Sequence, residues 1–253
     1  MSRRERLKRL FLDGFHAMDI ARPLLSYDAE KDGVEVREIM QRTDLELCGV
    51  RVAGLVAGYV TPADLVEGQC AESLRPFGTG QVVSEGSGLQ TALEALDQHD
   101  YCFLSTLGTV DAFVGRSDVE KPPARMWLFG MITIIEMFVA RTIEARFPDG
   151  SWSEHVAPGR LEYAQKLRDE RRRRNQYVNL LDCLQLSDKA QILVRDPESA
   201  TEMGFESRRE AKEAIKRLES LRNNLAHSQE IVAHDWPIIS RLAGRLERVL
   251  SRA

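Results

Sequence analysis

The chain has 253 residues, of which 43% are hydrophobic and 29% are charged, so it can form one large globular domain or two ordinary ones. The formal net charge of −4 is unevenly distributed: residues 1–120 carry 12 basic and 20 acidic side chains, and residues 121–253 carry 23 and 19. A polyanion would be repelled by the first part and mildly attracted by the second, although the two parts could equally attract each other.

Several classes of protein are excluded by the same sequence. The N-terminal residues lack the unbroken apolar stretch and small-residue cleavage site of a secretion signal. The longest apolar run, 127–140, is interrupted by Glu136 and is too short to span a bilayer, so it predicts a buried helix. The cysteines are scattered and the histidines outside the C-terminal motif have no companions at ligand spacing, which argues against a disulfide framework and a metal site. We expect a cytoplasmic protein that does not enter a membrane.

The first half of the chain repeats itself. The stretch 48–65, "CGVRVAGLVAGYVTPADL", aligns without a gap with 102–119, "CFLSTLGTVDAFVGRSDV", at a constant offset of 54 residues. Each copy has a β-branched run, a glycine turn at Gly54 or Gly108, a second apolar run and a short polar stretch, which predicts strand, turn, strand and helix start. The leucine spacing in 88–100 predicts a helix before the second copy.

An aspartate closes each copy, Asp64 in the first and Asp118 in the second. Both are expected near the first turn of a helix, where the helix dipole and free backbone N–H groups favour a carboxylate. A purely structural capping role would explain both residues.

These residues resemble the motif of cystathionine-β-synthase-type (CBS) domains, which is a glycine, two apolar residues, Thr or Ser, two variable residues and Asp. The first copy, "GYVTPADL", has Gly58, Thr61 and Asp64 in these places, whereas the second, "AFVGRSDV", has Ala112 for the glycine and Gly115 for the Thr or Ser. The resemblance covers roughly residues 10–120.

What the resemblance implies is a pair of copies about a pseudo-twofold axis, with an adenine nucleotide bound between them. Asp64 would hold the ribose hydroxyls and Thr61 a phosphate, while the second cleft would keep Asp118 without its phosphate residue. The implied ligand is ATP, ADP, AMP or S-adenosylmethionine. A degenerate pair that serves only for dimerisation is the alternative.

Beyond Pro122 and Pro123 the pattern becomes helical. We expect a long apolar helix over 125–147, a loop over 148–159, a charged helix over 160–177 and one or two short helices over 178–194. A helix over 207–229 is expected to be N-capped by Ser207, and a last helix over 235–250 carries Pro237 in its first turn. The predicted fold class is α+β, with tandem β-strand/helix repeats in residues 1–121 and an all-α bundle in residues 122–253.

Three polar residues lie near the end of the 207–229 helix, in "RLESLRNNLAHSQ". At 100° per residue the leucines form the core stripe, Asn223 and His227 lie on the opposite face, and Arg222 lies on the shoulder about 140° from His227. A histidine that helps to end a helix would need no further explanation.

An Arg, a polar residue and a His near a helix end in an α-bundle resemble the motif of the HEPN superfamily, in which Arg and His are separated by four to six residues. Arg222, Asn223 and His227 match this pattern. The resemblance covers about residues 124–253 and implies a homodimeric, metal-independent endoribonuclease. His227 would be the general acid/base, Arg222 the phosphate clamp and Asn223 the orienting residue. Some members of the superfamily only bind.

Two further features stay open in the sequence. The run "RDERRRR" contains Arg171, Arg172, Arg173 and Arg174, which could contact RNA phosphates or form a solvated helix face. Glu136, inside the apolar helix, could pair with an arginine of the bundle or line the active cleft.

The function predicted from these features is a nucleotide-regulated endoribonuclease of a stress response or a defence system, whose partners are RNA and a second copy of the chain, with no DNA. It needs no cofactor for catalysis. The alternative is a non-catalytic signalling protein whose CBS pair binds nucleotide and whose helical domain dimerises and binds a partner. A third alternative is that both halves are structural and bind no small ligand.

Overall fold

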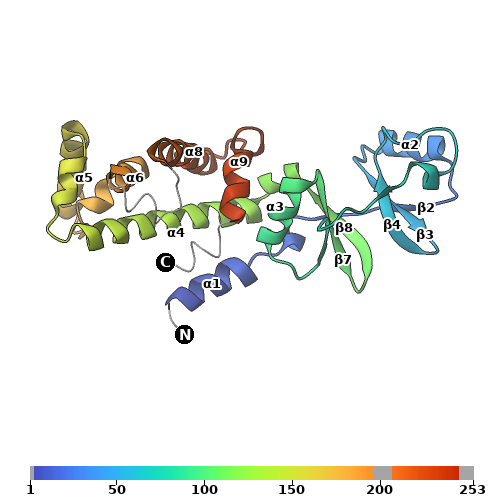
Figure 1. Ribbon diagram of the computed structural model, residues 1–253, viewed down its shortest axis with the longest axis horizontal. Coiled ribbons are helices and arrows are strands. Elements are labelled where there is room, and N and C mark those ends of the chain that lie inside the picture. The colour runs from blue at the N-terminus through green and yellow to red at the C-terminus, as the bar shows by residue number, and fades with distance from the viewer. Residues whose placement is uncertain (1–2, 196–206, 245–253) are drawn as a thin grey trace. The chain divides into compact units, whose positions relative to one another are not determined.

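In a computed structural model, which describes residues 3–195 and 207–244, the chain divides into two compact units. One unit comprises residues 6–125, and the other comprises residues 126–253 together with residues 1–5. The first unit has two four-stranded sheets with short helices, and the described part of the second is helical (Figure 1). The α+β class is therefore confirmed.

Two copies of one supersecondary unit build residues 6–125. In each copy a short strand leads through a helix to a parallel strand, which then forms an antiparallel hairpin. The first copy consists of β2 (Ser26–Asp28), α2 (Gly33–Arg42), β3 (Cys48–Val52) and β4 (Leu55–Val60). The second consists of β6 (Val82–Ser84), α3 (Leu89–Gln98), β7 (Tyr101–Thr106) and β8 (Thr109–Gly115). The predicted strands and the helix over 88–100 are confirmed, whereas α1 (Arg3–Asp13) and α2 were not predicted.

The hairpin turns repeat even their strained backbone. Ala53 and Gly54 have φ of 51° and 83°, and Leu107 and Gly108 have φ of 50° and 85°. Positive φ at both central residues is the type I′ geometry, whose twist matches that of the flanking strands. Both hairpins also have a register irregularity at the same repeat position, after Val50 and after Leu104. The predicted glycine turns are therefore confirmed.

Each sheet is completed by a two-residue strand that directly precedes the other copy in the chain. The strand β1 (Arg22–Pro23) precedes the first copy but pairs antiparallel with β8, and β5 (Arg75–Pro76) precedes the second copy but pairs with β4. The strand orders are β1-β8-β7-β6 and β2-β3-β4-β5. This reciprocal exchange ties the two copies together through the backbone.

Two hydrophobic clusters hold this unit together. One lies between α2 and its sheet and includes Val36, Met40 and Val50. The other lies between the copies and is largely aromatic: the ring centroids of Tyr59 and Phe103 are 4.8 Å apart, and several further rings pack around them. Burial of these residues stabilises the unit, as does that of Leu89, Leu93 and Leu96 on α3.

The helical unit begins within α4 (Pro122–Arg146) and continues with four further α-helices among the described residues. These are α5 (Pro158–Arg173), α6 (Leu186–Arg195), α8 (Arg208–Ala226) and α9 (Val232–Ala243) (Figure 1). Short 3₁₀ helices, Ser151–His155 and Leu181–Cys183, lie between them. The core joins α4, α5 and α6 through Val139, Ile143, Trp152, Ala164 and Ile192.

The long apolar helix expected over 125–147 is confirmed as α4, which begins three residues earlier and ends one residue earlier. The apolar run is short, but the helix that contains it has 25 residues and is long and apolar enough to cross a membrane by those two criteria. The core helix of a soluble protein passes the same test, and 39% of the apolar window is buried. Trp127, Met131 and Ile143 are fully buried, whereas Met126 and Phe129 lie on an exposed stripe.

The last two helices also refine the sequence prediction. Ser207 caps α8 as expected, since its hydroxyl accepts a hydrogen bond from the backbone N–H of Glu210 at 3.1 Å. The final helix starts at Val232 rather than at residue 235, so Pro237 lies in its second turn and not in its first. The predicted continuation over 245–250 lies outside the described residues.

Candidate functional site

The first repeat aspartate, Asp64, lies in a turn after β4 and not in the helix start that was predicted. Its Oδ2 accepts hydrogen bonds from the Thr61 backbone N–H at 2.8 Å and the Thr61 hydroxyl at 2.7 Å. Its Oδ1 accepts from the Arg75 guanidinium. Burial opposes the charge on Asp64, but the hydrogen bonds from Thr61 and Arg75 outweigh it and lower the pKa of the carboxyl. The structure thus brings together Thr61 and Asp64, the two predicted ligand-binding residues of the first copy, and adds Arg75.

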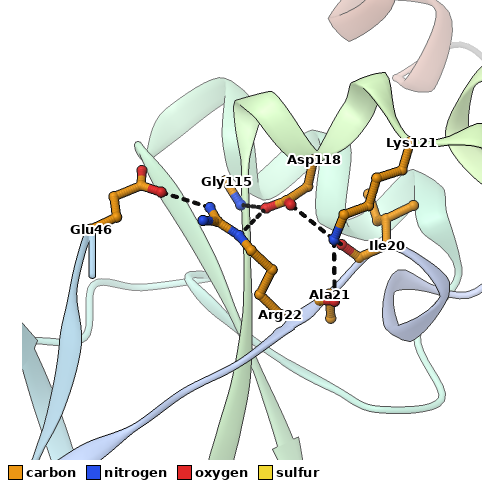
Figure 2. Close-up of polar contacts among 7 residues, drawn as sticks. All are labelled: Ile20, Ala21, Arg22, Glu46, Gly115, Asp118 and Lys121. Carbon is orange, nitrogen blue, oxygen red and sulfur yellow. Dashed lines mark hydrogen bonds and ion pairs between the residues drawn. The ribbon is translucent and has the colours of Figure 1, made fainter. Parts of the chain in front are cut away.

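The second repeat aspartate, Asp118, is buried in the 3₁₀ helix Arg116–Glu120, which precedes α4 (Figure 2). It accepts hydrogen bonds from the Gly115 backbone N–H at 2.8 Å and from Arg22 Nε at 3.0 Å, and Lys121 Nζ lies 3.0 Å from its Oδ1. Lys121 also donates to the Ile20 carbonyl at 2.6 Å. With a 4% exposed side chain and donors on both oxygens, this carboxylate is held by the protein and has little surface left for a ligand.

Arg22 connects the two copies. Its Nη2 lies 2.7 Å from Glu46, just ahead of β3 (Figure 2). Its guanidinium carbon lies 4.5 Å from the centroid of the Phe113 ring on β8. Burial alone would lower the pKa of Arg22, but the pairing with Glu46 and Asp118 raises it. The Arg22 side chain is therefore fixed by two carboxylates and one ring face.

The two aspartates are held by equivalent arginines, which the sequence analysis missed. Arg22 and Arg75 are each followed by a proline, in the exchanged strands β1 and β5, and are 53 residues apart. The repeated Arg-Pro dipeptide was the available signal, but it is shifted by one residue from the offset of 54 and lies outside the aligned stretch. Both arginines reach the aspartate of the sheet that their strand completes.

Two motif positions are explained by these strands. A Cβ on Gly58 would lie 2.2 Å from the Arg75 carbonyl oxygen, so the first motif glycine lets β5 approach. A Cβ on Gly115 would lie 3.1 Å from Arg22 Nη2. The glycine that replaces Thr in the second copy therefore leaves room for the guanidinium, which takes over the contact to Asp118.

In the helical unit, Arg222, Asn223 and His227 are all exposed at the end of α8; the helical geometry predicted this for Asn223 and His227 and placed Arg222 on the shoulder of the core stripe. The Arg222 Nη1 donates to the Asn223 side-chain oxygen at 3.3 Å. The core face of α8 is formed by Leu218 and Leu221 with two alanines. The trio is thus accessible to a large ligand.

His227 is the C-cap residue of α8 and not part of its last turn. The chain leaves the helix through Ser228, whose φ is 54°, with hydrogen bonds from Ser228 N to the Leu225 carbonyl and from Gln229 N to the Asn224 carbonyl. This is a Schellman ending. The neighbouring Asn224, which the sequence analysis passed over, donates to the buried Asp235 of α9 at 2.7 Å and fixes the two helices together.

Glu136 pairs with a lysine and not with an arginine. Its Oε1 lies 2.9 Å from Nζ of Lys189 on α6, whose side chain is 4% exposed. Both residues line a pocket of about 360 Å³ together with Thr133, Met137, Ala140, Arg141, Glu144 and Asp182. The pocket lining contains no member of the α8 trio, so Glu136 and the trio are separate features.

The arginines at 171–174 end α5. Arg172, Arg173 and Arg174 are exposed, Arg171 is half-buried, and Arg174 lies 2.5 Å from Glu170. Basic residues in a last turn are favoured by the helix dipole, which accounts for part of this pattern. Among residues 3–195 and 207–244, no group of three or more His, Cys, Asp or Glu side chains could hold a metal ion.

No protein-family model and no curated protein matches the sequence. The solved structures similar to the chain include the CBS domain of a bacterial CNNM/CorC-family Mg²⁺ transporter, with 14% identity and a TM-score of 0.39 over 49% of this chain and 86% of that chain. CBSX2 in complex with AMP has 14% identity and a TM-score of 0.37, over 42% and 93%. Staphylococcus aureus OpuCA has 13% and 0.35, over 40% and 92%. The structural neighbours thus include CBS domains, matched over roughly the N-terminal half of the chain.

Proposed function

We propose that residues 6–125 are a CBS-type pair that binds one adenine nucleotide, and that the helical unit is a metal-independent endoribonuclease. The observation that carries the proposal for the first unit is the pair of equivalent aspartates after β4 and β8, of which Asp118 has a 4% exposed side chain and Asp64 a 14% exposed one. Asp64 would bind the ribose hydroxyls and Thr61 a phosphate. Asp118, with its three fixed donors, would remain a structural carboxylate.

For the helical unit, the exposed trio at the end of α8 supports the proposal. The His227 imidazole would take the proton of an RNA 2′-hydroxyl, whose oxygen then forms a bond to phosphorus while the bond from phosphorus to the 5′-oxygen breaks. A protonated imidazole from the second copy of a homodimer would protonate that 5′-oxygen. Arg222 would hold the phosphate, Asn223 would orient its neighbours, and Arg171–Arg174 would bind the RNA backbone. Glu136 is left out of this scheme because it pairs with Lys189.

Regulation would follow from a different affinity of the nucleotide for two arrangements of the dimer, since a ligand that binds both equally shifts nothing. In this proposal the protein acts in the cytoplasm, on RNA and not on DNA, in a stress response or in defence.

A non-catalytic signalling protein is the second candidate. The Schellman ending at Ser228 and the Asn224–Asp235 hydrogen bond favour it, because they give the "RNNLAHSQ" stretch a structural role without any chemistry. In that case the helical unit would serve for dimerisation and for binding a partner.

Cleavage of a mixed RNA pool in the presence of EDTA tests the two candidates. We would compare the wild type, His227→Ala and His234→Ala, the last as a control because His234 is also exposed but lies on α9. Each protein would be assayed with and without AMP, ATP and S-adenosylmethionine. Fragments ending in 2′,3′-cyclic phosphate from the wild type and His234→Ala only are expected. Absence of cleavage by a folded wild-type dimer under every condition would favour the signalling protein.

A further inference from the structure

We propose that Arg75 makes the Asp64 site selective for phosphorylated nucleosides, because its guanidinium exchanges the Asp64 carboxylate for the phosphate of the ligand. This inference rests on the proposed nucleotide site and goes beyond it by naming the ligand class, a nucleoside 5′-phosphate in preference to adenosine or S-adenosylmethionine.

Both oxygens of Asp64 are already engaged. Its Oδ2 accepts two hydrogen bonds from Thr61, and its Oδ1 accepts from Arg75. The contact with the Thr61 backbone N–H is local to the turn and does not need to change. A carboxylate has about four acceptor positions and three of those on Asp64 are filled, so a ribose diol must displace one donor, and Arg75 is the donor that comes from outside the turn.

Arg75 can leave its carboxylate more readily than Arg22 can. The Arg75 side chain is 48% exposed, and its partners are Asp64 and the Tyr59 side chain. The Arg22 side chain is 33% exposed and is held by Glu46, Asp118 and the Phe113 ring. An ion pair contributes less as its groups become more exposed, so separation of the Arg75–Asp64 pair, with exposed fractions of 48% and 14%, costs less than separation of the Arg22–Asp118 pair, with 33% and 4%.

The released Arg75 guanidinium must stay near the Asp64 turn. The strand β5 stays in place, because its backbone packs directly over Gly58, so the Arg75 head can move only as far as its side chain reaches. Asp64 and Thr61 lie on the same turn, with 2.7 Å between the hydroxyl and the carboxylate. A phosphate bound at Thr61 is therefore within reach of Arg75. The phosphate replaces the Asp64 carboxylate as the anionic partner of Arg75 and forms a charge-assisted hydrogen bond with it. A sulfonium in that place would add a second cation, and adenosine would add no charge.

The test measures binding of adenosine, AMP and S-adenosylmethionine by isothermal titration calorimetry to the wild type, Arg75→Gln and Arg51→Gln. Arg51 is a matched control, because it is also ion-paired, with Asp28, but lies on β3 beside the hairpin turn, at the end of the β3–β4 hairpin opposite to Asp64. We expect AMP to bind the wild type and Arg51→Gln about tenfold or more tightly than adenosine, as one charge-assisted pair implies. In Arg75→Gln the affinity for AMP should fall to that for adenosine, while adenosine binds better than to the wild type.

Two results would overturn the inference alone. One is that the wild type binds AMP and adenosine with equal affinity. The other is that Arg75→Gln increases the affinity for AMP and for adenosine by the same factor, which would mean that Arg75 only competes with the ribose for Asp64. Absence of binding of all three ligands to folded wild type and Arg75→Gln would instead overturn the proposed nucleotide site, and the inference with it. Thermal unfolding without ligand establishes that each variant is folded.

Discussion

Replacement of Asp118 by asparagine should destabilise residues 6–125 far more than the same change at Asp64. The amide introduced by Asp118→Asn would keep an oxygen for the Gly115 N–H but would leave Arg22 and Lys121 without their anion. Hydrogen bonds to charged groups contribute about 1.5–3 kcal/mol each in buried settings. Arg22 and Lys121 are each about one-third exposed, and each keeps a second partner, Glu46 for Arg22 and the Ile20 carbonyl for Lys121. The lower end of that energy range therefore applies. We expect a loss of about 2–3 kcal/mol for Asp118→Asn and about 1 kcal/mol for Asp64→Asn.

The assay must report on the correct unit. All three tryptophans, Trp127, Trp152 and Trp236, lie after residue 125, so tryptophan fluorescence would follow the helical unit. Urea unfolding should therefore be followed by hydrogen exchange of the β7 and β8 amides, because two units need not unfold in one transition. Equal losses for the two variants, or a loss below about 1 kcal/mol for Asp118→Asn, would refute the reasoning about the donors to the buried carboxylate.

Three further outcomes follow from the same contacts. Folding lowers the pKa of the Asp64 carboxyl, so its contribution to stability is present above the pKa of the unfolded chain and is lost as the pH falls below about 4. In urea titrations the difference in stability between wild type and Asp64→Asn should therefore shrink from pH 6 to pH 3. A constant difference would mean that folding does not change the pKa of Asp64. Leu107→Asn should raise stability by about 0.5–1 kcal/mol, since Leu107 is 99% exposed at positive φ and asparagine suits that turn; unchanged thermal unfolding would contradict this. Glu136→Gln should destabilise the helical unit by about 3 kcal/mol in tryptophan-monitored unfolding, because it leaves the buried Lys189 unpaired. The double variant Glu136→Gln/Lys189→Met should recover most of the lost stability. Absence of recovery would mean that loss of this ion pair is not the cause.

The local parts of the fold were predictable from the sequence, and the long-range parts were not. The offset of 54 residues predicted both hairpins with their glycine turns, because each turn is decided by a few neighbouring residues. The strands β1 and β5 have two residues each and no periodicity, so nothing local indicated their exchange. The helix α2 was detectable in principle, since Asp32 caps it and accepts from the Glu35 N–H at 2.9 Å.

The candidate sites divide in the same way. Helical arithmetic predicted that Asn223 and His227 would be exposed, because the position of a face depends only on spacing. It could not predict that Asn224 binds Asp235 or that Glu136 binds Lys189, because each partner lies on another helix. Arg22 and Arg75 were missed for that reason too: an arginine acquires its partner only when the exchanged strands are in place.

The exchange of β1 and β5 sets an order of events during synthesis on the ribosome. The sheet β2-β3-β4-β5 can close as soon as residue 76 has emerged, since all its strands lie in one contiguous stretch. The strand β1 emerges before any of them, but it can pair only after β8 has been synthesised, and β8 ends at residue 115. During that interval Arg22 has no Asp118, and the nascent chain exposes a strand that fits only a partner still to be made. A pause in translation between these two points would prolong the time in which β1 of one chain can pair with β8 of another, and so would select between a monomeric pair and a strand-swapped dimer.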